Sequence, residues 1–115
     1  MSVTLYGIAN CDTVKKARDW LDARGIAYTF HDYKKLGADP AKLSAWVAAA
    51  GWETVLNRTG TTFRKLPEAD QQGIDAAKAV AVMAAHPSCI KRPVVEHPGG
   101  FLVGFKPDLW AAALA

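Results

Sequence analysis

The pattern of apolar and polar positions divides the first third of the chain into a strand, a helix and a second strand. Residues 3–8 form a β-branched and aromatic run that predicts a buried strand ending in a turn. From Thr13 onward apolar residues recur at helical spacing, and Gly25 stands where a C-terminal helix cap belongs. Residues 27–33 predict a second strand. A β-α-β order of this kind predicts two parallel strands.

Helical patterns dominate the middle of the chain. Asp39-Pro40 is typical of a capped helix start, and Gly51 ends that helix. A polar loop is expected over residues 57–62, and an Ala-rich helix is expected near residues 74–85.

Strand character returns near the C-terminus. Residues 92–97 and 101–105 predict two strands, and the turn Pro98-Gly99-Gly100 between them predicts a hairpin. Residues 107–114 predict a closing helix. The whole pattern indicates one α/β domain over residues 1–115, with a helical insertion at about 38–87.

Composition narrows the class of protein. The 115 residues are 50% hydrophobic and 22% charged, with a formal charge of +3, so one real core can form and no basic nucleic-acid footprint is present. No run approaches the roughly 18 to 20 apolar residues of a membrane helix, and the N-terminus lacks a signal-peptide pattern. We therefore expect a cytoplasmic protein with no nucleic-acid or membrane partner, and its two cysteines are expected to be reduced thiols.

Cys11 is the candidate nucleophile. It follows the first predicted strand and precedes the first helix, where unpaired backbone N–H groups and the helix dipole favour a thiolate. Lys15 and Lys16 in the first helical turns add positive charge. The alternative is an ordinary buried thiol, since cysteine is among the most buried residue types.

A second, resolving thiol is absent from the immediate motif. Cys11-Asp12-Thr13-Val14 is not a Cys-x-x-Cys motif, so resolution must come from elsewhere. Cys89 is the one internal candidate, and a core-packing role explains it at least as well. The three histidines show no metal-ligand spacing with either cysteine, so we expect no metal site.

Several motifs in a fixed order resemble the ArsC/Spx family, most closely its YffB-like branch. They are Asn-Cys-Asp-Thr-Val-Lys-Lys-Ala at 10–17, Leu-Asn-Arg-x-Gly-Thr at 56–61, His-Pro-Ser at 86–88 and Lys-Arg-Pro at 91–93. The resemblance covers essentially the whole chain. It implies a thioredoxin-like core, built from β-α-β, a β-hairpin and a C-terminal helix, with a helical insertion in the middle. It also implies that Arg92-Pro93 is a cis-proline turn beside the nucleophile.

The arsenate reductases of this family imply a chemistry for Cys11. Their cysteine attacks an oxyanion, arginines hold the anion, and glutathione with glutaredoxin discharges the sulfur. Cys11, Arg58 and Arg92 match that pattern, whereas the arginine expected after the last strand is replaced within Gly-Phe-Lys-Pro at 104–107. Lys106 supplies charge there without the bidentate geometry of arginine, which counts against arsenate reduction.

The resemblance therefore implies an oxidoreductase, a glutathione-dependent thiol reductase or arsenate reductase-like protein. Its single nucleophilic cysteine, Cys11, would form a mixed disulfide that external glutathione or glutaredoxin resolves. The residues expected to bind the anion or glutathione are Asn10, Thr13, Arg58, Arg92, Pro93 and Lys106. For the arginines the alternative is a solvated surface position, and for Asn10 and Thr13 it is turn formation or simple exposure.

The expected partners follow from this interpretation. Glutathione is the co-substrate, glutaredoxin is a candidate partner, no cofactor is bound and the protein is a monomer. The competing hypothesis is an Spx-like regulatory protein that binds RNA polymerase without catalysis.

Overall fold

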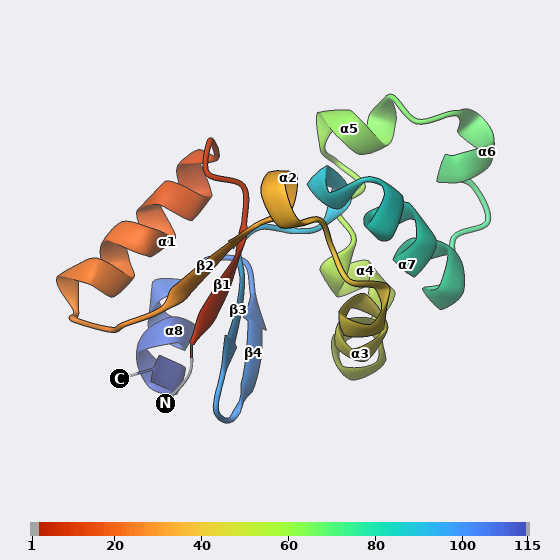
Figure 1. Ribbon diagram of the computed structural model, residues 1–115. Coiled ribbons are helices and arrows are strands. Elements are labelled where there is room, and N and C mark those ends of the chain that lie inside the picture. Colours follow the sequence, from red (N-terminus) through yellow and green to blue (C-terminus); the bar gives the residue numbers. More distant parts are fainter. Residues whose placement is uncertain (1–2, 115) are drawn as a thin grey trace. The chain divides into compact units, whose positions relative to one another are not determined.

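A four-stranded mixed sheet is the framework of one of the two units into which the chain folds. The computed structural model describes residues 3–114, and this first unit contains the chain up to Tyr33 together with the chain from Arg92 onward (Figure 1). The second unit is residues 34–91. The predicted single domain with an insertion at about 38–87 stays a prediction.

The sheet has the strand order β2-β1-β3-β4. Its strands are β1 (Thr4–Gly7), β2 (Thr29–Asp32), β3 (Val94–His97) and β4 (Gly100–Val103). β1 and β2 are parallel, so the predicted β-α-β unit is confirmed, and β3 pairs antiparallel with both β1 and β4. The predicted C-terminal hairpin is therefore also confirmed.

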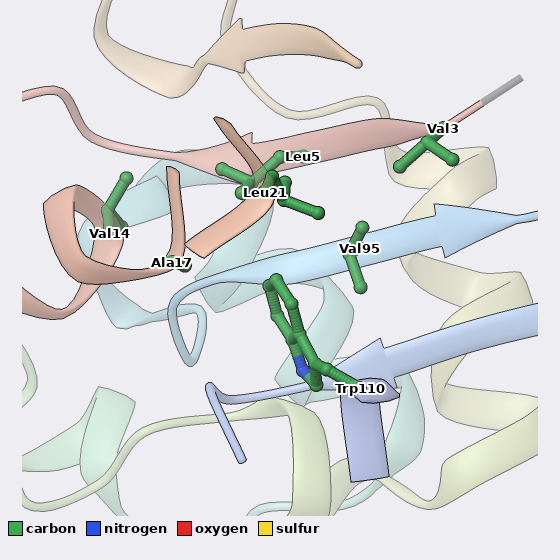
Figure 2. Close-up of a cluster of buried hydrophobic side chains, with 7 residues drawn as sticks. All are labelled: Val3, Leu5, Val14, Ala17, Leu21, Val95 and Trp110. Atoms are coloured by element: carbon green, nitrogen blue, oxygen red, sulfur yellow. The ribbon is translucent and has the colours of Figure 1, made fainter. Parts of the chain in front are cut away.

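Two helices cover the same face of this sheet. They are α1 (Asp12–Ala23), between β1 and β2, and α8 (Pro107–Leu114), at the end of the chain. Figure 2 shows the buried cluster that joins them to the sheet: Val3, Leu5, Val14, Ala17, Leu21, Val95 and Trp110. Because apolar positions in α1 recur at helical spacing, one face of the helix is buried against alternate residues of the strands.

A close approach between β1 and α1 fixes the start of the helix. A β-carbon on Gly7 would lie 2.8 Å from Cγ2 of Val14, which is completely buried. Glycine at the end of β1 is therefore what lets the first helical turns, and with them Cys11, lie directly against the sheet.

The second unit is helical. Its elements are α3 (Pro40–Ala50), α4 (Trp52–Val55), α5 (Thr61–Arg64), α6 (Glu68–Gln71), α7 (Ala76–Ala85) and the short 3-10 helix η1 (Pro87–Cys89). α2 (Tyr33–Leu36) begins at the last residue of the first unit. The side chain of Asp39 accepts a hydrogen bond from Ala41 N–H at 3.0 Å, which confirms the predicted capped start of α3.

The short helical turns are where the structure departs from the predictions. The loop expected over residues 57–62 stops early, because Thr61 already begins α5. Phe63 of α5 is 5% exposed, so burial of this one aromatic side chain holds a turn that has little helical signal of its own. Among residues 3–114 no helix is long and apolar enough to cross a membrane.

Candidate functional site

Cys11 lies at the junction between the sheet and the first helix. It is the N-cap residue of α1, with extended backbone angles, and its carbonyl accepts the first helical hydrogen bond from Lys15 N–H at 2.9 Å. Its side chain is partly exposed and packs against the edge of the buried cluster. No described residue forms a hydrogen bond with the thiol, and the residue stands at the N-terminal end of a twelve-residue helix.

The register of the sheet brings the predicted residues of the first unit to the same edge as Cys11. Tyr6 pairs with Val94, so the residues just before β3, Arg92 and Pro93, lie where β1 ends. Val94 also pairs with Val103, so the segment leading to Lys106 leaves β4 at that edge. The tertiary structure thus gathers segments that are about 80 and 95 residues apart in sequence.

Exposure differs among these residues. Arg92 is half-buried, Pro93 is buried, and the remaining three, Asn10, Thr13 and Lys106, are exposed. The Arg92–Pro93 peptide bond is cis, as the resemblance implied. The binding roles of these residues stay predictions.

Backbone hydrogen bonds fix the proline segment to the end of β4 and to α8. The Pro93 carbonyl accepts a hydrogen bond from Gly104 N–H at 2.7 Å, and the Gly104 carbonyl accepts one from the Trp110 indole N–H at 3.0 Å. Gly104 has a φ of +80°, a backbone conformation that favours glycine. The position at which an arginine was expected from the resemblance is therefore occupied by a tightly bonded turn, with Lys106 exposed beyond it.

Tyr33 is a residue at this edge that the sequence analysis did not select. Gly7 pairs with Asp32, so Tyr33 follows β2 at the edge where β1 also ends. Its side chain is only 3% exposed and lies against the rings of Tyr6 and His31, yet its hydroxyl has no hydrogen-bond partner among the described residues. In the sequence it is an ordinary strand-end aromatic, and no local signal marks its burial.

The electrostatics of Tyr33 follow from this position. Burial, with smaller effects of Tyr6 and Glu96, raises the pKa of Tyr33 far above its ordinary value, and the positive charge of Arg92 opposes that rise. The phenol of Tyr33 is therefore a neutral hydrogen-bond donor. The positive charge that opposes the rise in its pKa belongs to Arg92, which lies at the same edge of the sheet.

Arg58 belongs to the helical unit. It is exposed on the loop after α4, and its guanidinium carbon lies 5.1 Å from the centre of the Trp52 ring. Asn57 shapes this loop, because its side-chain oxygen accepts hydrogen bonds from the N–H and the hydroxyl of Thr59 at 3.1 and 3.0 Å. The role of Arg58 beside Cys11 stays a prediction.

Cys89 is buried in the helical unit. It is 1% exposed within η1, and its carbonyl accepts a hydrogen bond from Asn57 N–H at 2.7 Å. Neither Cys11 nor Cys89 forms a disulfide. Burial agrees with the core-packing interpretation of Cys89 and leaves Cys11 as the accessible sulfur.

The comparisons with known proteins extend over almost the whole chain. The model of the ArsC family matches residues 6–113. A solved structure named "YFFB (PA3664) PROTEIN" is 60% identical, covers 99% of this chain and 100% of its own, and superposes with a TM-score of 0.97. An arsenate reductase (ArsC) related protein from Brucella melitensis is 57% identical over 97% of this chain and 93% of its own, with a TM-score of 0.76.

Two curated relatives have lower sequence identity to this chain than these two solved structures. An uncharacterized protein of Haemophilus influenzae is 40% identical over 98% of this chain and 99% of its own length. The global transcriptional regulator Spx of Listeria innocua is 25% identical over 92% of this chain and 82% of its own length. The likeness to the solved structures confirms the predicted α/β fold class.

Proposed function

Because this chain belongs to the ArsC family, we propose that it is a glutathione-dependent thiol reductase in which Cys11 is the nucleophile. The observation that carries the proposal is the position of Cys11: a partly exposed sulfur at the N-terminal end of α1, at the sheet edge that also carries Arg92 and Lys106. The thiolate is the reactive form of cysteine, and the start of a helix is a common position for a nucleophilic cysteine.

The reaction proceeds through a mixed disulfide. The Cys11 thiolate attacks one sulfur of a disulfide, forms a new S–S bond with it and expels the other sulfur as a thiolate. Glutathione thiolate then attacks the mixed disulfide, which returns Cys11 as a thiolate and releases the oxidised product. Glutaredoxin is the alternative reductant for this second step.

The cationic side chains are assigned to the carboxylates of glutathione. Arg92 is half-buried at the Cys11 edge, and arginine offers a planar pair of donors that suits a carboxylate. Arg58 and Lys106 are the further cations, while Asn10 and Thr13 supply polar groups beside the sulfur. Pro93, buried and fixed by Gly104, forms the wall of the site.

Arsenate is a weaker candidate substrate than a disulfide. At the Gly104 turn, the backbone N–H of Gly104 donates a hydrogen bond to Pro93 and its carbonyl accepts one from Trp110. The cation that follows this turn is a lysine, Lys106. A compact oxyanion held by fewer arginines loses bidentate hydrogen bonds, whereas the two separated carboxylates of glutathione need only one cation each. We place the reaction in the cytoplasm, where glutathione keeps thiols reduced.

A mixed disulfide of glutathione and cysteine tests the proposal. Turnover is followed as oxidised glutathione, through glutathione reductase and NADPH. The wild-type protein is expected to show glutathione-dependent turnover, Cys11→Ser is expected to have none, and the matched variant Cys89→Ala is expected to keep most of it. Full activity in Cys11→Ser contradicts the proposal.

A second candidate is a regulator that binds RNA polymerase without catalysis, and it is favoured by the Spx relatives. Against it, the position that would complete a Cys-x-x-Cys switch is Val14, which is completely buried in the core. Immobilised protein and purified RNA polymerase distinguish the two. Stoichiometric retention of polymerase, combined with no turnover of the mixed disulfide, supports the regulator.

A further inference from the structure

A polar groove lies on the first unit away from the Cys11 edge. It runs between the second half of α1 and the segment that leads into β2, and has a volume of about 360 Å³. Its lining residues are Arg18, Asp22, Ile26, Ala27, Tyr28 and Phe30. β2 is the outermost strand on this side of the sheet, so no further strand of the described chain covers the groove. The volume falls at the lower end of the roughly 300 to 1,000 Å³ typical of small-molecule sites.

Arg18 is held in one orientation in this groove. Its Nε–H donates a hydrogen bond to the Tyr28 hydroxyl oxygen at 3.1 Å, and its guanidinium carbon lies 4.3 Å from the centre of the Phe30 ring. The stacking occupies the face of the guanidinium and the hydrogen bond occupies Nε. The two terminal amino groups form no hydrogen bond or ion pair with any described residue, so their paired N–H donors remain available.

The negative charge in the groove comes from Asp22. It lies one helical turn after Arg18 on α1, its side chain is exposed, and no described cation is paired with it. One groove thus presents a fixed carboxylate-binding fork and, beside it, an unpaired carboxylate. Ile26, Ala27 and Phe30 supply apolar surface to the same groove.

We propose that this groove binds the zwitterionic head group of an α-amino acid. The ligand carboxylate accepts hydrogen bonds from the two terminal amino groups of Arg18, and the ligand ammonium pairs with Asp22. An oriented guanidinium loses little side-chain freedom when a ligand binds, which favours affinity. The proposal is independent of the function proposed for Cys11.

Two sources carry this head group: a free amino acid and the γ-glutamyl end of glutathione. Titration calorimetry of the Cys11→Ser protein with L-leucine and with S-methylglutathione distinguishes them, because neither probe can react at sulfur. Saturable binding of either probe that Arg18→Gln weakens supports the proposal and identifies the source, whereas binding of S-methylglutathione that Arg18→Gln leaves unchanged belongs to the site at Cys11 and counts against the groove. Absence of binding for both overturns it.

Probes with only one charge test the pairing. N-acetyl-leucine lacks the ammonium and leucine methyl ester lacks the carboxylate, so each is expected to bind about tenfold more weakly than L-leucine. Equal binding of N-acetyl-leucine and L-leucine overturns the role of Asp22 and with it the zwitterion site.

Matched variants on the same helix locate the site. Arg18→Gln and Asp22→Asn are each expected to raise the dissociation constant about tenfold. Arg24→Gln and Asp19→Asn make the same charge changes outside the groove. Each is expected to change the dissociation constant less than about twofold. Arg24 is a close control because it too stacks on an aromatic ring, Trp20, at 4.3 Å. If all four variants bind the ligand with the same affinity, the groove is not the site. If Arg18→Gln fails to fold, comparison of the exposed pair Asp22→Asn and Asp19→Asn still shows whether the ligand binds in the groove.

Discussion

Gly7 and Val14 approach so closely that a single added carbon on Gly7 would lie 2.8 Å from Cγ2 of Val14. The contact joins the end of β1 to the first turn of α1, on either side of Cys11. Val14 is fully buried and cannot turn away without disturbing the cluster of Figure 2. The orientation of the helix that carries the sulfur thus depends on the absence of a side chain at Gly7.

Gly7→Ala is expected to lower the free energy of unfolding by about 1 to 3 kcal/mol, because the new methyl group overpacks a filled core. Urea denaturation measures the change. Gly99→Ala is the control, since a β-carbon there would meet His97 at an ordinary 3.6 Å. Equal stability of the two variants would contradict the close-packing interpretation.

The two cysteines are expected to differ in their rate of alkylation in the native protein. Cys11 is partly exposed whereas Cys89 is 1% exposed. Iodoacetamide should therefore modify Cys11 at least about tenfold faster, since Cys89 reacts only after local opening. Peptide-resolved mass spectrometry reports both rates in one sample, and in urea the difference should disappear. Equal native rates would show that Cys89 is accessible.

Tyr33→Phe is expected to stabilise the protein by about 1 kcal/mol at neutral pH, because it removes a buried hydroxyl that has no hydrogen-bond partner within residues 3–114. Tyr6→Phe is the matched substitution, and it is expected to have the opposite effect on the free energy of unfolding. The Tyr6 hydroxyl donates to a carboxylate oxygen of Glu96 at 2.6 Å, and its loss should cost about 1 to 3 kcal/mol. Denaturant unfolding of both variants tests the pair, and destabilisation by Tyr33→Phe would contradict the assignment.

Stability is expected to fall at alkaline pH, in part through Tyr33. The pKa of Tyr33 is raised in the folded protein, so above about pH 10 the unfolded chain releases a proton that the folded chain retains. The contribution of protonated Tyr33 to the free energy of unfolding is complete below the ordinary tyrosine pKa and is lost as the pH rises above that value. In Tyr33→Phe the alkaline fall should be shallower than in wild type, as measured by thermal melts across that range.

Arg92→Ala and Arg58→Ala are expected to raise the KM for glutathione about tenfold, because each removes a charge-assisted hydrogen bond to a carboxylate. The change in kcat should be smaller, since neither residue forms or breaks a bond to sulfur. Arg64→Ala is the control, as it removes an exposed arginine of α5 that carries no site role. A KM unchanged by Arg92→Ala would remove this residue from the glutathione site.

Local patterns were sufficient to predict the regular elements that bury an apolar face. The spacing of Val14, Ala17 and Leu21 predicted α1, and the turn Pro98-Gly99-Gly100 predicted the hairpin. Short turns such as α5 and α6 were not predicted, because four residues carry too little periodicity and form only when packing holds them.

The sequence by itself determined the position of Cys11 between a strand and a helix, since both elements have local signals. Motif resemblance then implied that Arg92 and Pro93 lie near it. Only the tertiary structure decided that they and Lys106 leave the sheet at that edge, because strand register depends on pairing between distant segments. It also decided the burial of Tyr33 and the stacking of Arg18 on Phe30, for these depend on side chains that meet only when separate elements pack together.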